Sequence, residues 1–251
     1  MISEDMMFRK YVKSKLYNAP ELKPYLEEAS IVRTENDPGL VWDIMVFLPD
    51  ELFQRFSAQY GESFAIDDND HVPPVFIRVK SFSWLSRDFA WRLPIALWIY
   101  QHSLVFQDKT GSFNRVLQEQ SQKFSEKVSE MLKRKYLEFR TERHNLRHAL
   151  RKNADISITL IKATVVKLSL EICFLVEGKP YPYKKWLSRT ALTSTVNGKK
   201  ILKISESFLR EEEPEAIIRL SDDLLNQVAI KLYETRMFSE DFLHKWWFHL
   251  L

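Results

Sequence analysis

The sequence has 251 residues, of which 45% are hydrophobic and 28% are charged. This balance is typical of a globular protein with a buried core and excludes a disordered or collagen-like chain. The 37 Lys and Arg residues against 34 Asp and Glu residues give a net charge of +3, too small to indicate nucleic-acid or membrane binding without local evidence. Only 5 glycines are present, so helices rather than Gly-rich loops and tight hairpins are expected to dominate.

The single cysteine, Cys173, excludes an intramolecular disulfide and a zinc site made of several thiolates. It lies in an apolar run, so we expect a buried, reduced thiol. The first residues, MISEDMMFRKYVK, begin with acids and do not resemble a secretory signal. The longest stretch without acids or bases, residues 93–107, is shorter than the ~20 residues that cross a bilayer. We therefore expect a soluble, cytoplasmic protein that does not bind membranes.

Strand signals come first in the N-terminal half. Residues 31–36 and 40–49 are rich in β-branched and aromatic side chains and are separated by Asp37-Pro38-Gly39, which predicts a hairpin. Residues 75–82 alternate in polarity, and 104–107 form a short apolar run before a turn. The acidic stretch between them, DDNDHVPP, is predicted to be a loop. These segments predict a small mixed β-sheet.

Helices are predicted around these strands and throughout the second half. In the first half they cover residues 3–17, 20–29, 49–61 and 84–100. Apolar residues spaced by threes and fours over 114–150 predict one or two long amphipathic helices, and the apolar segment 154–177 predicts the central helix of a bundle. Further helices are expected toward the C-terminus, the last with Ser239 as N-cap. The sequence thus predicts an α+β protein with an α/β domain over 1–112 and a helical bundle over 113–251.

The order of these elements resembles the two-domain nucleotidyltransferases of the polymerase-beta-like type. In that family an Asp-x-Asp strand is followed by a helix, a strand with a third carboxylate, a helix, an Asp-x-x-Gly turn and a helical domain. The matching segments are LVWDIMVFLPDE, VFIRV, VFQDKTGSF and, in the helical domain, KPYPYKKWL. The resemblance covers roughly residues 30–190 and implies the fold. It also implies Mg²⁺ and a nucleoside triphosphate as cofactor and substrate if the chain is active.

Most of the residues that the chemistry requires are missing. Nucleotidyl transfer needs two or three carboxylates on adjacent strands to hold Mg²⁺ against a triphosphate. Only Asp43 fits, as the expected metal ligand and catalytic residue, because the other positions correspond to Val41 and Arg78. The phosphate-binding Gly-Ser turn before the first strand is absent as well. These departures argue against the family's usual catalysis.

Two further sets of acids could take part in catalysis. Asp67, Asp68 and Asp70, with His71, could supply metal ligands, although a solvated acidic loop is the simpler interpretation. Glu138 lies where similar enzymes place the carboxylate that deprotonates the acceptor hydroxyl, and it could equally belong to a solvated helix face.

A basic segment follows the predicted domain boundary. Residues 126–152 contain nine Lys and Arg against four Glu, a local net charge of +5. Arg140, Arg143, Arg147 and Arg151 recur at helical spacing, so one face could bind the phosphates of a nucleotide, RNA or DNA. An ordinary charged helix face is the alternative. Arg143 and His148 also have the Arg-x4-His spacing of helical endoribonuclease toxins, a spacing that chance produces in any Arg-rich helix.

Two aromatic clusters allow both a binding role and a structural role. Lys184 and Lys185 lie among Tyr181, Tyr183 and Trp186 and could hold a base or a phosphate, whereas the adjacent prolines favour a rigid turn packed on the bundle. At the C-terminus, Trp246, Trp247 and Phe248 could dock a partner or a second copy of the chain, and folding onto their own core is the simpler account.

Three functional hypotheses remain. The first is a catalytically degraded nucleotidyltransferase-like protein that at most binds nucleotide or phosphate in a cleft between the domains, with these predicted binding residues: Arg78, Arg140, Arg143, Arg147, Lys184 and Lys185. The second is an active Mg²⁺-dependent enzyme that transfers a nucleotidyl group to a small hydroxylated molecule or a protein, with Asp43 and Glu138 as catalytic residues. The third is a non-enzymatic interaction module that uses the basic helix.

Overall fold

The computed structural model describes residues 4–34, 40–236 and 238–249. The chain forms two compact units, Met1–Lys123 and Phe124–Leu251. Their boundary lies within the long helix α4 (Ser112–Arg151). The predicted domain boundary at residues 112 and 113 coincides with the start of this helix and remains a prediction.

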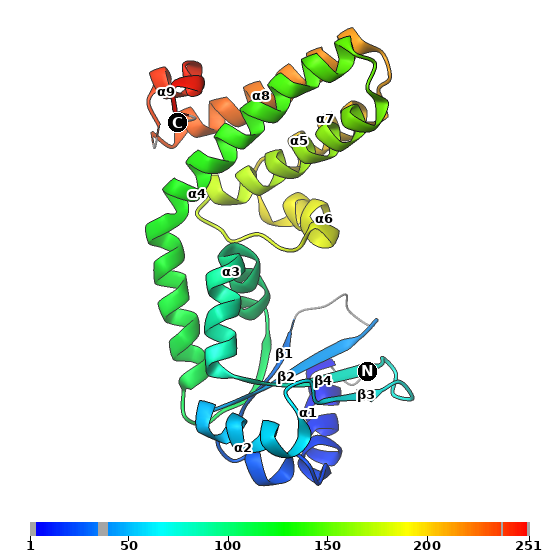
Figure 1. Cartoon of the computed structure of the whole chain (residues 1–251), viewed down its shortest axis with the longest axis vertical. Coiled ribbons are helices and arrows are strands. Elements are labelled where there is room, and N and C mark those ends of the chain that lie inside the picture. Colours follow the sequence, from blue (N-terminus) through cyan, green and yellow to red (C-terminus); the bar gives the residue numbers. More distant parts are fainter. Residues whose placement is uncertain (1–3, 35–39, 237, 250–251) are drawn as a thin grey trace. The chain divides into compact units, whose positions relative to one another are not determined.

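The first unit contains a five-stranded mixed sheet with the strand order β3-β4-β2-β1-β5 (Figure 1). Its strands are β1 (Ser30–Thr34), β2 (Trp42–Leu48), β3 (Ala65–Asp68), β4 (Val75–Ser81) and β5 (Leu104–Asp108). The pair β2–β4 is parallel and the other three pairs are antiparallel. The predicted pairing of β1 with β2 is confirmed, while its predicted turn, Asp37-Pro38-Gly39, lies outside the described residues.

The sheet separates two layers of helices (Figure 1). On one side, α1 (Glu4–Ser14), two short 3-10 turns, η1 (Leu16–Asn18) and η2 (Lys23–Tyr25), and α2 (Asp50–Tyr60) cover the main core. That core contains Ile44 and Val46 of β2 and Ile77 and Val79 of β4, all buried. On the other side lies α3 (Phe82–Gln101), which has a non-helical backbone at Arg92. This break comes two residues before Pro94, whose ring and missing N–H interrupt a helix.

Two predictions of local structure in this unit were wrong. A helix was expected over residues 20–29, but only the turn η2 forms there, because Pro24 cannot donate the hydrogen bond that a helix interior needs. The acidic stretch was expected to be a loop from Asp67, but Asp67 and Asp68 belong to β3. Asp67 pairs with Arg78 of β4, and Asp68 accepts a hydrogen bond from the Tyr11 hydroxyl at 3.1 Å. These contacts offset the low strand propensity of aspartate.

The second unit is helical, as the sequence predicts. It contains the C-terminal part of α4, then α5 (Asp155–Val176), α6 (Lys184–Ser194), α7 (Gly198–Arg210), α8 (Pro214–Glu234), α9 (Glu240–His244) and the 3-10 turn η3 (Trp246–His249). The segment 114–150 belongs to one continuous helix. Gly198 begins α7 where a Cβ would lie 1.9 Å from the carbonyl oxygen of Ala191, so this close approach requires glycine.

Smaller predictions for the second unit are confirmed. The Ser239 hydroxyl accepts a hydrogen bond from the Phe242 N–H at 3.1 Å, which makes it the N-cap of α9. Cys173 is a free, buried thiol, and burial raises its pKa to about 12. Among the described residues, no helix is long and apolar enough to span a membrane.

Candidate functional site

The candidate site is the half of one sheet face that the helices of the first unit leave uncovered. Because side chains alternate along a strand, Asp43 and Met45 of β2, Phe76 and Arg78 of β4, and Asp67 of β3 point to the same side. Four of them are half-buried and Asp67 is exposed. We call these five residues the open face.

The remainder of this side of the sheet is covered. Phe47, the next residue of β2 on the same side, is fully buried. Its ring stacks on Phe82 at a centroid distance of 6.0 Å and on Phe113 at 5.9 Å. Accessibility is therefore confined to the end of β2 that carries Asp43.

The strand register places four side chains in one row across the sheet. Asp43 is opposite Thr34 of β1 and Phe76 of β4, and Phe76 is opposite Asp67 of β3. Neighbouring strands lie about 4.8 Å apart, so the backbones of Asp43 and Asp67 are separated by roughly 10 Å. Neither direct register partner of Asp43 is a carboxylate.

Arg78 is opposite Met45, two residues along β4 from the row. Its Nη1 lies 2.6 Å from Oδ1 of Asp67, and it also donates to the carbonyl oxygen of its neighbour Ile77 at 3.0 Å. The guanidinium carbon lies 5.7 Å from the centre of the Phe76 ring. Arg78 therefore places a cation on the open face, at the position where the family resemblance implies a third carboxylate.

The open face does not provide the oxygen ligands that a shared Mg²⁺ needs. Mg²⁺ requires near-octahedral oxygen coordination at 2.0–2.1 Å. Asp43 and Asp67 have Phe76 between them, and Asp67 is paired with Arg78. Within the part of the chain that the structure describes, no group of three or more His, Cys, Asp or Glu residues could hold a metal ion. The residues present therefore do not fit a metal held jointly by two carboxylates.

The Asp-x-x-Gly turn has a clear structural role. Asp108, at the end of β5, accepts hydrogen bonds from the Ser30 hydroxyl at 2.6 Å and from the N–H groups of Phe113 and Asn114 at 3.2 and 3.0 Å. It thereby caps the first turn of α4 and joins that turn to β1. The sequence predicted the turn but not this function of its first residue.

Glu138 lies on α4 within an ion-pair cluster. Its carboxylate lies 3.8 Å from Nζ of Lys135, which is also 2.8 Å from the buried carboxylate of Glu171 on α5. Lys167 contacts Glu171 as well, at 3.1 Å. The side chain of Glu138 is 46% exposed. Its role as a catalytic base stays a prediction.

Most of the arginines on the predicted basic face are already bound to groups of the helical unit. Arg143 is ion-paired with Asp222 of α8, and Nη2 of Arg147 lies 3.7 Å from the other oxygen of Asp222. The side chain of Arg143 is only 14% exposed. Burial, together with the charges of Arg147 and Arg140, lowers the pKa of the Arg143 guanidinium to about 10. Asp222 was not identified from the sequence.

Arg140 binds the C-terminal segment. Its Nη1 donates to the Tyr136 hydroxyl at 3.2 Å and to the carbonyl oxygen of Leu243 at 3.4 Å. The guanidinium also lies over the ring of Trp246, 5.3 Å from its centre. Trp246 is buried whereas Trp247 and Phe248 are exposed, so the C-terminal aromatic residues pack in part on their own unit.

Lys184 and Lys185 begin α6 and are both exposed. Nζ of Lys185 lies 4.1 Å from the centre of the Trp186 ring, close enough for a cation–π interaction. Tyr181 and Trp186 are buried. The aromatic side chains thus pack in the helical unit, while the two ammonium groups remain accessible.

Comparisons with known proteins agree with this architecture. A family described as a domain of unknown function (DUF4037) matches residues 95–187, which is less than half of the chain. No curated protein sequence matches. The crystal structure of a nucleotidyltransferase-like protein from Exiguobacterium sibiricum 255-15 is similar with a TM-score of 0.52 and 10% sequence identity, covering 91% of this chain and 78% of the other. The chain has a nucleotidyltransferase-like fold. The predicted fold class, α+β with a helical C-terminal region, is thereby confirmed.

Proposed function

We propose that this nucleotidyltransferase-like protein binds nucleotide or phosphate without catalysing Mg²⁺-dependent nucleotidyl transfer. The proposal rests on one observation, the guanidinium of Arg78 on the open face, at the strand position where the family resemblance implies a metal-binding carboxylate. A cation there opposes a bound Mg²⁺ and favours an anion. We place the bound phosphate at Arg78.

The surroundings of Arg78 support an exchangeable anion. Its present partner, Asp67, is 45% exposed, and Arg78 itself is 39% exposed. Such exposed pairs contribute only about 0.2–1 kcal/mol, so a phosphate with a higher charge and a matching bidentate geometry can replace the carboxylate. Lys80 lies two residues further along the same side of β4 and adds a second positive charge, although its Nζ donates to the carbonyl oxygen of Glu62 at 3.2 Å. The half-buried ring of Phe76 supplies a surface on which a base can stack.

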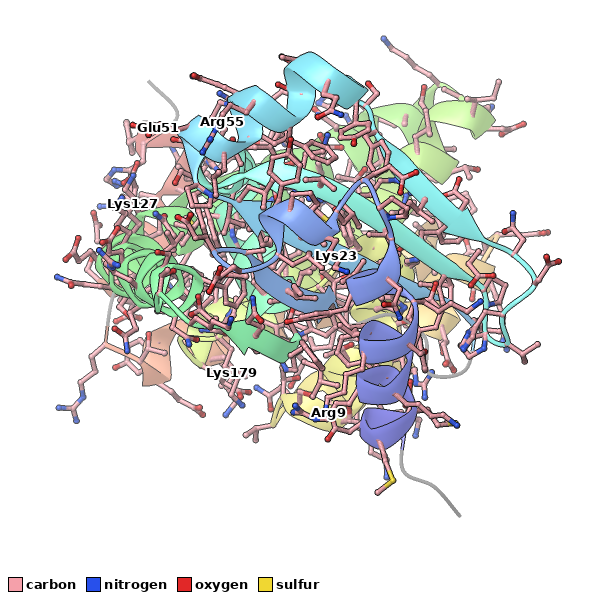
Figure 2. The ribbon with its side chains drawn as sticks, turned by 90° about the horizontal axis from the view of Figure 1, so that it is seen from below. Arg9, Lys23, Glu51, Arg55, Lys127 and Lys179 are labelled. Carbon is pink, nitrogen blue, oxygen red and sulfur yellow. The ribbon has the colours of Figure 1, made fainter. Side chains whose placement is uncertain are left out.

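The test is thermal unfolding of the full chain with each nucleoside triphosphate, with and without Mg²⁺. A ligand at 100 times its dissociation constant adds about 2.7 kcal/mol to stability. We expect stabilisation without Mg²⁺ that Arg78→Ala abolishes and Asp43→Ala leaves in place. Arg55→Ala is the matched control, since Arg55 lies on the exposed side of α2, beside Glu51 (Figure 2).

An active enzyme is the second candidate, because Asp43 lies on β2, the strand that the family resemblance matches to the Asp-x-Asp strand. Stabilisation that requires Mg²⁺ and disappears in Asp43→Ala, together with pyrophosphate release, would establish this candidate and overturn the first. If no triphosphate stabilises the protein under either condition, both are wrong and the interaction-module hypothesis takes their place.

The predicted phosphate-binding residues of the helical unit fall into two groups. Arg140 and Arg143 are held by Tyr136, Leu243 and Asp222. Arg147, Lys184 and Lys185 are exposed and stay the better candidates for anion contacts. We expect Lys184→Ala and Lys185→Ala to weaken nucleotide binding less than Arg78→Ala, measured in the same unfolding experiment.

A further inference from the structure

Two histidines on α4 face each other on the surface of the helical unit. His144 and His148 are four residues apart, so they lie one turn from each other on the same side of the helix. Their Nε2 atoms are 3.2 Å apart, and their ring centres are 4.9 Å apart with an angle of 66° between the planes. Both side chains are exposed.

We propose that His144 and His148 form a two-histidine binding site for Zn²⁺. Zinc binds histidine nitrogen at 2.0–2.1 Å and prefers tetrahedral geometry. Two nitrogens bound in this way lie about 3.3–3.4 Å from each other. The observed separation of 3.2 Å is within the tolerance of such a site. The helix therefore positions both donors before the metal arrives.

The alternative use of this contact, a hydrogen bond between the rings, contributes little. It requires one ring to carry its proton on Nε2 while the other accepts. The net contribution of such a hydrogen bond to stability is only about 0.5–1.5 kcal/mol. A metal uses the lone pairs of both Nε2 atoms, and the separation of these atoms leaves the distance that two ligands of one metal need.

The composition of the site indicates which metals it accepts. Imidazole nitrogen suits Zn²⁺, Cu²⁺ and Ni²⁺, whereas Mg²⁺ prefers hard oxygen ligands. Among the described residues there is no third His, Cys, Asp or Glu to complete a cluster, so the remaining coordination positions are open to water or to another molecule. Such an open site is exchangeable rather than structural.

The neighbouring charges set the strength of binding. Three exposed cations near the histidines repel a dication. Two lie on the last turns of α4, Arg147 and Arg151, and Lys152 follows in the turn after the helix. Arg147 is partly neutralised by Asp222. Because salt screens exposed charges, Zn²⁺ binding is expected to strengthen as an inert salt is added, opposite to the behaviour of an anion at this surface.

The test uses isothermal titration of the full chain with Zn²⁺, and with Mg²⁺ as the contrasting metal. We expect the wild type to bind one Zn²⁺ per chain and to give no heat of binding with Mg²⁺. His144→Ala and His148→Ala should each lower the zinc affinity by at least about tenfold, because each variant keeps a single ligand without a chelate partner. Alanine at exposed helix positions preserves the helix. His244→Ala, an exposed histidine on α9, is the control and should bind like the wild type.

A spectroscopic measurement identifies the ligands directly. Electron paramagnetic resonance of the protein with one equivalent of Cu²⁺ should show two coordinating imidazole nitrogens in the wild type and one in either variant. Wild-type zinc affinity in both variants, or no Zn²⁺ binding by the wild type at millimolar concentration, would overturn the proposal. Because Arg78 and the open face take no part in these readouts, failure here is distinct from failure of the phosphate-binding function.

Discussion

The ion pairs Arg78–Asp67 and Arg143–Asp222 have the same chemistry in different surroundings. In the sheet unit, the two side chains are 39% and 45% exposed. In the helical unit, Arg143 is 14% and Asp222 is 38% exposed. An exposed pair is weak and its members can change partner, whereas a half-buried arginine depends on its acid, because a buried charge without a partner is costly.

This contrast assigns different roles to the two sets of arginines. The arginine-rich segment of α4 has the more positive sequence, yet Arg140 and Arg143 are committed to the packing of α8 and the C-terminal segment. The single arginine of β4 has a partner that a ligand can displace. Accessibility and the strength of existing contacts, rather than the local density of charge, are therefore the grounds on which Arg78 is proposed as the anion site.

The largest expected effect is on the helical unit. Asp222→Ala leaves the guanidinium of Arg143 without its ion pair. Breaking a fully buried pair costs about 3–5 kcal/mol, and because Asp222 is partly exposed we expect roughly 2 kcal/mol. The measurement is the denaturant dependence of Cys173 labelling, since the buried thiol reacts only when the helical unit opens.

The neighbouring acid provides the control for this prediction. Asp223 is exposed on the same helix, and Asp223→Ala removes the same charge without breaking the pair. We expect its effect to stay within about 0.5 kcal/mol. Equal destabilisation by the two variants would show that the Arg143–Asp222 pair contributes no more than an exposed pair.

The sequence predicted the local elements well where local signals decide them. Alternation over residues 75–80 placed Phe76 and Arg78 on one face of a strand, and the helical spacing over 114–150 predicted α4. It also placed Asp43 on a strand, and the family resemblance matched that strand and β4 to the two strands that carry the carboxylates in the family. These predictions depend on side-chain periodicity and on the order of elements, which a single sequence contains.

The sequence could not supply the partners of the charged residues. That Asp67 joins Arg78 depends on the register of β3 against β4, and that Asp222 joins Arg143 depends on the packing of α8 on α4. Both are contacts between segments that lie apart in the chain, so no local pattern reports them. Thus the cations of the candidate site were predictable, and which of them are accessible to a ligand was not.

A second, smaller effect concerns acid stability of the sheet unit. Asp50, at the start of α2, accepts hydrogen bonds from the backbone N–H and the hydroxyl of Ser83 at the start of α3. Burial alone would raise the pKa of Asp50, but the hydrogen bonds from Ser83 and Ser81, with the charge of Arg87, lower it below its usual value. The ionised carboxylate therefore stabilises the fold at neutral pH.

The pH dependence follows from the direction of that shift. The lowered pKa means that this stabilisation is present above the ordinary aspartate range, about pH 4, and is lost as the pH falls through the lower pKa of the folded protein. We expect Asp50→Asn to be less stable than the wild type at pH 7, by well under 1 kcal/mol because the group is exposed. Melting temperatures measured from pH 7 to pH 3 should show this difference at pH 7 and its disappearance toward pH 3. A difference that grows as the pH falls would contradict the assigned direction.

For the exposed pair Arg78–Asp67, the expected effects on stability and on binding have opposite signs. Asp67→Ala breaks the ion pair with Arg78, so it should lower the free energy of unfolding by less than about 1 kcal/mol. It also removes the carboxylate that a phosphate must displace, so it should raise nucleotide affinity about 1.4- to 5-fold, which corresponds to the about 0.2–1 kcal/mol of an exposed ion pair. Asp70→Ala is the matched control, because Asp70 is exposed nearby and carries the same charge. The wild type and the two variants are titrated with a nucleoside triphosphate without Mg²⁺, which separates competition at Arg78 from a general effect of net charge. A gain confined to Asp67→Ala means that the ligand takes the place of the acid at Arg78, whereas an equal gain in both variants means that it responds only to net charge and that Arg78 is not its site.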